Sequence, residues 1–143
     1  MSAQISVSIS ERPLDVAATI GAATTAETGG TGVFVGTVRA TPSTEADKQV
    51  VRLDYEAHPT LAVEAMRALA LDAAGKWDLQ RVVAIHRTGS CELGEPTVVI
   101  ACSAAHRAEA LEACRWLIDE IKATVPIWKK EIYTDGSSWV GAH

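Results

Sequence analysis

The sequence predicts a single α+β domain in which helices pack against a largely antiparallel sheet. Three observations support this prediction. The chain has 143 residues, of which 48% are hydrophobic and 22% are charged, as in an ordinary globular domain. Runs of alternating apolar and polar residues are interspersed with longer runs at helical spacing, in the order βαββαββαβ. No internal repeat or long linker divides the sequence, so the domain is expected to span residues 1–143.

The first elements are a strand, a helix and a second strand. Residues 4–9 alternate as a short strand does, and Pro13 suits the first turn of the helix that follows. The stretch 22–32 is small, polar and glycine-containing, which is typical of a loop. Residues 33–39 are then predicted to form a strand.

The middle of the chain predicts a strand followed by a helix. A polar connection over 41–48 leads to alternating residues in which Leu53 and Tyr55 share the apolar face. This alternation indicates a half-buried antiparallel strand. After Pro59 the apolar residues recur at helical spacing, and Gly75 is expected to end that helix.

The last third predicts a hairpin, a long helix and a final strand. Residues 81–88 and 97–102 are β-rich and are joined by a short glycine-containing segment, as in a hairpin. A long amphipathic helix follows, and Pro126 ends it because the residue before a proline disfavours the helical conformation. A final strand over 127–133 completes the predicted domain.

Charge and cysteine content exclude several classes of protein. Lysine and arginine total 13 against 18 aspartate and glutamate residues, which gives a net charge of −5. Proteins that bind the nucleic-acid backbone usually carry a basic patch instead. Cys91, Cys102 and Cys114 lack metal-ligand spacing and are expected to be buried and reduced. No apolar run approaches the ~18 residues of a membrane helix, and no leader peptide is recognisable. We therefore expect a cytoplasmic protein without metal, nucleic-acid partner or membrane contact.

The start of the long helix is the first candidate site. Ser103 or a neighbour can cap it, and His106 and Arg107 fall in its first turn. Unpaired N–H groups at a helix start suit an anion. An arginine there is explained if a phosphate or carboxylate ligand supplies the negative charge. The alternative is that Arg107 pairs with a nearby acid such as Glu109.

The other end of the same helix is the second candidate. Lys122 lies in the last turn, where a cation complements the helix dipole by about 0.3–1 kcal/mol without any further role. Lys129 and Lys130 are expected on opposite faces of the final strand. Because Pro126 turns the chain, Lys122 and Lys129 can converge beside an apolar tryptophan, and two close ammonium groups depress each other's pKa. Such an amine is able to act as a nucleophile or general base.

Arg39 is the third candidate because it ends a predicted strand, a place that often carries ligand-binding side chains. A lone arginine there is also often only solvated. His86 stands in the middle of a strand without a second ligand at metal spacing, and it is expected to be structural. Phosphate-cradling, dinucleotide-binding, nucleophile-elbow and zinc-protease motifs are all absent from the sequence, so nucleotide-driven chemistry is not expected.

Five segments together resemble a known family. They are "FVGTVR" (34–39), "LDYEAHPTLA" (53–62), "IHRTGSCELGE" (85–95), "SAAHRAEALEAC" (103–114) and "IDEIKATVPIWKKE" (118–131). In this order, over about residues 30–140, the sequence is similar to the large, catalytic subunit of molybdopterin synthase. The resemblance implies an α/β-hammerhead fold and a sulfurtransferase of molybdenum cofactor biosynthesis. That enzyme converts cyclic pyranopterin monophosphate (precursor Z) to molybdopterin by installing two sulfurs.

The resemblance also implies partners. The sulfur donor is the thiocarboxylated C-terminus of a small ubiquitin-like subunit, whose tail enters a pocket of the large subunit. Two large subunits pair centrally in a heterotetramer, with one small subunit at each end. No cofactor is expected to stay bound permanently, because the pterin monophosphate is the substrate.

The family's functional positions fall on residues already singled out. The expected substrate-binding residues are Thr37, Val38, Arg39, His106, Arg107, Lys122, Lys129, Lys130 and Glu131. In this set Arg39 and its neighbours line the pterin-phosphate site, and His106 and Arg107 hold the anionic end of the substrate. Lys122 and Lys129 correspond to the catalytic lysines. Lys122 is assigned to activating or orienting the acyl and thio groups, and Lys129 to substrate charge and proton transfer.

Two alternatives remain open. The first is a catalytically silent homologue that acts as a binding or scaffold module. The joint presence of Arg39, His106, Arg107, Lys122 and Lys129 disfavours it, since a scaffold has no need of this set. The second is an unrelated enzyme that acts on a phosphorylated heterocycle through a lysine imine.

Overall fold

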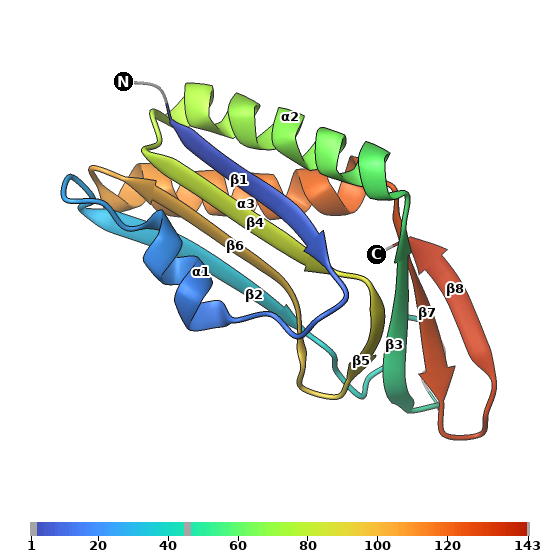
Figure 1. Ribbon diagram of the computed structural model, residues 1–143. Coiled ribbons are helices and arrows are strands. Elements are labelled where there is room, and N and C mark those ends of the chain that lie inside the picture. Colours follow the sequence, from blue (N-terminus) through green and yellow to red (C-terminus); the bar gives the residue numbers. More distant parts are fainter. Residues whose placement is uncertain (1–2, 45–46, 143) are drawn as a thin grey trace.

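The computed structural model describes residues 3–44 and 47–142, which form three helices and eight strands in two four-stranded sheets (Figure 1). The first, here called the main sheet, has the order β1 (Gln4–Ser10), β4 (Arg81–Arg87), β6 (Pro96–Ala104) and β2 (Gly30–Thr37). Strand β1 pairs with β4 in parallel, and the other pairs are antiparallel. The expected antiparallel pairing of 81–88 with 97–102 is confirmed.

Helices cover both faces of the main sheet (Figure 1). Helix α1 (Val16–Ala23) packs on one face, where Ala23 contacts a small cluster of β4 and β6 residues. Helices α2 (Pro59–Trp77) and α3 (Arg107–Thr124) lie on the opposite face. Each side chain fully buried there, such as Ile100 of β6, contributes about 1.5–3 kcal/mol.

The second sheet, here called the side sheet, has the order β5 (Gly89–Glu92), β3 (Val50–Ala57), β7 (Ile127–Tyr133) and β8 (Ser138–Ala142), all antiparallel. It lies beyond the end of the main sheet where α2 begins and α3 ends (Figure 1). One buried cluster includes residues of both sheets, among them Leu53 of β3 and Ile100 of β6. The expected α+β class with helices packed on antiparallel-dominated strands is therefore confirmed.

Two strands were not expected from the sequence. Strand β5 has only four residues, too few to show a convincing alternation. Strand β8 is a sheet edge that pairs only with β7 among the described strands. Both exist because a neighbouring strand offers them hydrogen bonds, which no local pattern reveals. The expected single sheet is therefore two sheets.

Several boundaries also differ from the expectation. Strand β2 begins at Gly30, opposite Ala104 of β6, so the expected loop over 22–32 ends earlier and the expected strand over 33–39 stops at Thr37. The expected connection over 41–48 lies partly outside the described residues. Helix α2 runs past Gly75 to Trp77 and is capped by Asp78, whose φ of 49° places it in the left-handed region.

The start of α3 requires a correction. Its N-cap residue is His106, whose side chain makes no capping hydrogen bond, and Arg107 is the first helical residue. Ser103 does not cap the helix, because it lies in β6 and accepts a hydrogen bond from the backbone N–H of Arg81. The expected end of the helix before Pro126 is confirmed. Within the described residues, no helix is long and apolar enough to cross a membrane.

Candidate functional site

A polar hollow of about 410 Å³ lies where the main sheet meets the side sheet. Strand β2 contributes Phe34 and Thr37 to its wall, and Arg39 follows from the connection after β2. Helix α3 contributes Lys122, and β7 contributes Lys129 and Glu131. Three cationic side chains and one carboxylate thus face a single cavity.

The two lysines converge for the reason that the sequence indicates. Helix α3 ends at Thr124, Pro126 turns the chain, and β7 begins at Ile127. The last turn of the helix and the third residue of the strand therefore face the same hollow. Their expected convergence is confirmed.

The expected tryptophan neighbour is not at this site. Trp128 lies on the opposite face of β7, with 48% of its surface exposed, because successive strand residues point to opposite faces. The aromatic wall is formed instead by Phe34 and Tyr55. Tyr55 of β3 stands directly opposite Lys129 in the antiparallel register, so their side chains share a face.

The surroundings of Lys122 make its amine easier to deprotonate. Partial loss of water around the amine lowers the pKa of Lys122, and the positive charges of Lys129 and Arg39 lower it further. Lys122 as a whole is nevertheless exposed to solvent. Among the described residues it has no hydrogen-bond or ion-pair partner. This amine is therefore suited to proton transfer or nucleophilic attack.

Glu131 is a buried carboxylate with many donors. Its side chain is 3% exposed, and its Oε2 lies 3.6 Å from Nζ of Lys129. The Ser43 hydroxyl donates to Oε2 at 2.7 Å, the Ser43 backbone N–H donates to both oxygens at 3.2 Å, and the Tyr133 hydroxyl donates to Oε1 at 2.9 Å. Burial raises the pKa of Glu131, but these donors and the Lys129 charge outweigh it and hold the pKa below its usual value.

Sequence reasoning missed several residues of this hollow. Tyr55 is 6% exposed, packs edge-on against the ring of His86 at a centroid distance of 5.0 Å, and hydrogen-bonds Thr97. Burial raises the pKa of Tyr55 to about 12. The alternation of β3 places Tyr55 on the apolar face but does not say that this face meets a cavity. Ser43 lies in an irregular connection, where the sequence carries no signal for it.

Four of the expected site residues do not line the hollow within one chain. His106 and Arg107 start α3, whereas Lys122 lies fifteen residues later in the same helix, a separation of about 22 Å at 1.5 Å per residue. Val38 is buried in the core. Lys130 points to the opposite face of β7, toward an adjoining hollow.

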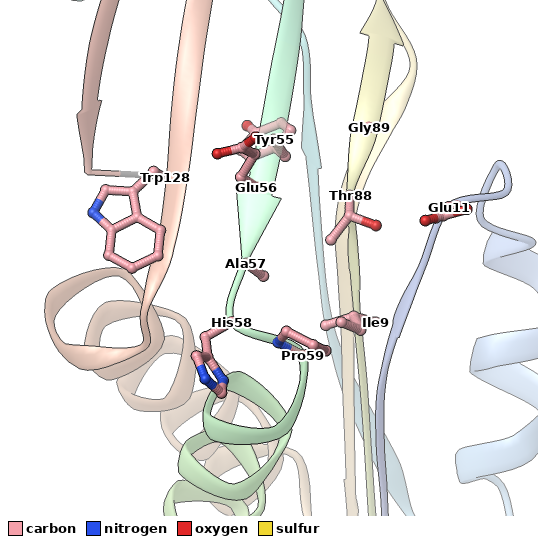
Figure 2. A pocket seen from close by; sticks show the side chains of 10 residues that line it. All are labelled: Ile9, Glu11, Tyr55, Glu56, Ala57, His58, Pro59, Thr88, Gly89 and Trp128. Carbon is pink, nitrogen blue, oxygen red and sulfur yellow. The ribbon is translucent and has the colours of Figure 1, made fainter.

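A second hollow of about 580 Å³ lies where β3 passes into α2 (Figure 2). Figure 2 shows Trp128 and His58 on one side and Glu11 on the other, with Glu56 between them. Nδ1 of His58 accepts a hydrogen bond from the backbone N–H of Leu61 and so caps α2. No lysine or arginine lines this hollow among the described residues, so it lacks the charge that an anionic substrate needs.

No described cysteine lines either hollow, and the described residues form no cluster that could hold a metal ion. Within residues 3–44 and 47–142, no three His, Cys, Asp or Glu side chains come together as metal ligands. Cys91, Cys102 and Cys114 are buried and unbridged, as the sequence predicts for reduced structural cysteines.

Comparison with known proteins identifies relatives over most of the sequence. The family model described as "MoaE protein" matches residues 9–124. A molybdopterin synthase catalytic subunit of Arabidopsis thaliana is 42% identical over 79% of this chain and 56% of that protein. Molybdopterin synthase catalytic subunit 1 of Mycobacterium tuberculosis is 40% identical over 93% of this chain and 88% of that protein. The chain thus spans about half the length of the plant relative and most of the mycobacterial one.

Solved structures show the same fold. The crystal structure of molybdopterin synthase from Staphylococcus aureus superposes with a TM-score of 0.84 and 29% identity, covering 98% of this chain and 96% of that chain. The MoaE protein from Burkholderia ambifaria superposes with a TM-score of 0.77 and 27% identity, over 98% of this chain and 89% of that chain. Both sheets and all three helices therefore belong to a shared architecture.

Proposed function

This chain belongs to the MoaE protein family, and on that premise we propose that it is the catalytic subunit of a molybdopterin synthase. It acts as a sulfurtransferase that converts cyclic pyranopterin monophosphate to molybdopterin. The observation that carries the proposal is the hollow in which Arg39, Lys122 and Lys129 converge. Three cations around one cavity suit a phosphate and a terminal thiocarboxylate, which are both anions.

The residues of the hollow divide by chemistry. Arg39 presents a planar guanidinium able to hold a phosphate with two hydrogen bonds, and Thr37 stands beside it on the same wall. Lys122 and Lys129 face the space where the thiocarboxylate meets the pterin. Their positive charge stabilises the negative charge that develops on oxygen when sulfur adds to a carbon. The pterin monophosphate enters and leaves as substrate and product, so no permanently bound cofactor is needed.

A second copy of the chain supplies His106 and Arg107 in this proposal. Strand β2 is an edge of the main sheet, and no described strand pairs with its outer side. Its first residue, Gly30, lies against Arg107, while its last, Thr37, lines the hollow. If two copies pair antiparallel along β2, the start of one strand lies beside the end of the other. Arg107 of one copy then approaches the hollow of its partner.

The composition of β2 supports such a pairing. Its sequence GTGVFVGT contains neither proline nor charge, the features that usually protect a free strand edge. A pair of large subunits with a small ubiquitin-like sulfur carrier at each end gives the expected heterotetramer. The relatives are named catalytic subunits, and the word subunit implies at least one further chain in the enzyme. Three cysteines without disulfide bonds favour the reducing cytosol as the cellular location of the protein.

Reconstitution tests the proposal directly. The purified chain is mixed with a thiocarboxylated small subunit and cyclic pyranopterin monophosphate, and molybdopterin is assayed. We expect product with the wild-type chain, and with a Lys76→Ala control, because Lys76 lies on α2 over the Trp116 ring. We expect loss of product with Lys122→Ala. No product from the wild-type chain with competent reagents would disprove the proposal.

The lowered pKa of Lys122 also favours a second candidate function. A neutral lysine amine can form an imine with a carbonyl of a phosphorylated heterocycle. Borohydride reduction in the presence of substrate distinguishes the two chemistries. A reduced adduct on Lys122 or Lys129 supports the imine, whereas sulfur transfer leaves both lysines unmodified.

A further inference from the structure

Ser43 lies between the second lysine and the buried carboxylate. Nζ of Lys129 donates to the Ser43 hydroxyl at 2.9 Å, and that hydroxyl donates to Oε2 of Glu131 at 2.7 Å. Direct contact between Lys129 and Glu131 is longer, at 3.6 Å, which is beyond hydrogen-bond distance. The Ser43 hydroxyl therefore bridges the Lys129 ammonium and the Glu131 carboxylate.

We propose that Ser43 is a positioning residue that fixes Lys129 in the hollow through Glu131 and thereby leaves Lys122 as the amine that exchanges protons. This inference rests on the proposed function. It keeps substrate charge with Lys129 but moves proton transfer, which the sequence analysis assigned to Lys129, to Lys122.

The carboxylate is saturated by other donors. Oε1 of Glu131 accepts a hydrogen bond from the Tyr133 hydroxyl, and both carboxylate oxygens accept from the Ser43 backbone N–H. Lys129 is consequently held at the edge of this cluster rather than drawn into a closed ion pair. An ammonium has three N–H donors, so two remain directed elsewhere after the bond to Ser43. Lys129 is thus a fixed cation suited to holding an anionic substrate group.

Lys122 differs because none of the described residues holds it. Among the described residues it has no hydrogen-bond or ion-pair partner, and the charge of Lys129 faces it across the hollow. A cation fixed at one place favours the neutral form of the neighbouring amine. Ser43 therefore acts on both lysines. It contacts Lys129 directly, and by fixing the position of the Lys129 charge it also influences Lys122.

The two contributions of Ser43 can be separated by mutation. Its backbone N–H ties the connection after Arg39 to Glu131, and its hydroxyl binds Lys129. Ser43→Ala keeps the backbone bond and removes the hydroxyl, whereas Ser43→Thr keeps both. Ser137 provides a matched control, because its hydroxyl accepts from Nζ of Lys48 at 2.8 Å in the same type of contact.

The experiment measures exchange of lysine ammonium protons with water by NMR on the full chain carrying 15N-lysine. The Lys129 signal is assigned with Lys129→Arg. We expect Ser43→Ala to speed exchange at Lys129 about tenfold, the effect of losing one hydrogen bond to a charged group, and Ser43→Thr to restore it. Ser137→Ala should speed exchange at Lys48 and leave Lys129 unchanged.

Sulfur transfer is then measured with the same variants. Ser43→Ala should lower kcat about tenfold, with an unchanged midpoint of thermal unfolding, and Ser43→Thr should recover the rate. Unchanged exchange at Lys129 in Ser43→Ala would overturn the inference, as would a wild-type rate in that variant. Failure of the wild-type chain to make molybdopterin would instead overturn the proposed function, and the exchange measurement would still decide whether Ser43 fixes Lys129.

Discussion

At the scale of single residues, the two lysines of the hollow have the same side chain and different surroundings. Lys129 is held by Ser43 beside the Glu131 carboxylate. Lys122 loses part of its water and faces two positive charges. Because both effects penalise the protonated form, the neutral amine of Lys122 is populated at lower pH than that of an ordinary lysine. Environment, rather than residue type, distinguishes their chemistry.

Chemical labelling tests this difference at Lys122. Only a neutral amine reacts with an acetylating reagent, so the extent of labelling against pH, read by peptide mass spectrometry, follows the pKa. We expect half-labelling of Lys122 at a lower pH than in the unfolded chain. Arg39→Gln removes one of the two repelling charges, so it should move the midpoint to higher pH. A midpoint unaffected by Arg39→Gln would show that the arginine does not act on this amine.

At the scale of elements, the approach of β2 to α3 positions both ends of the helix. An ideal Cβ on Gly32 of β2 would lie 2.4 Å from the carbonyl oxygen of Ala110 in α3, closer than real atoms come. The strand can therefore lie against the helix only because residue 32 has no side chain. This contact fixes the helix that carries Arg107 at its start and Lys122 in its last turn.

A pair of glycine substitutions tests the contact. Gly32→Ala should destabilise the fold by about 1–3 kcal/mol, as overpacking does. Gly21→Ala is the control, because a Cβ there meets nothing within 4 Å in helix α1. It should stabilise the fold by about 0.5–1 kcal/mol, since alanine favours a helix over glycine. Urea unfolding measures both, and equal stability of Gly32→Ala and wild type would contradict the close packing.

At the scale of the whole molecule, one chain holds only part of the expected site. Arg39, Lys122 and Lys129 face the hollow, but Arg107 lies at the far end of α3. A straight helix keeps its two ends apart, so no rearrangement within the chain brings them together. A second copy of the chain can bring its Arg107 to this hollow, if the start of its own α3 faces the hollow. Such a site is shared between two chains.

Mixing two inactive variants tests the shared site. Lys122→Ala and Arg107→Ala chains are combined in equal amounts and allowed to exchange partners. Half of the dimers then contain one chain of each variant. Each such dimer has one site with both defects and one intact site. The mixture should recover about a quarter of the wild-type activity, whereas each variant alone stays inactive. A mixture as inactive as its components would place both residues in the site of one chain.

The sequence by itself determined the type and order of most elements, and it indicated where the two lysines can meet. These depend on signals within a few residues of one another, namely alternation in strands, helical spacing, and the turn at Pro126 between Lys122 and Lys129. Local signals missed β5 and β8, because a short or exposed strand is stabilised by the neighbour with which it pairs.

Only the tertiary structure decided which other side chains share the hollow. Ser43 and Lys129 are 86 residues apart in sequence and 2.9 Å apart in space, and Tyr55 faces Lys129 through the register of β3 and β7. The separation of Arg107 from Lys122, by contrast, follows from the sequence, which already places them at opposite ends of one long helix. Strand register joins residues that are far apart in the sequence, so a pattern read along the sequence does not contain it.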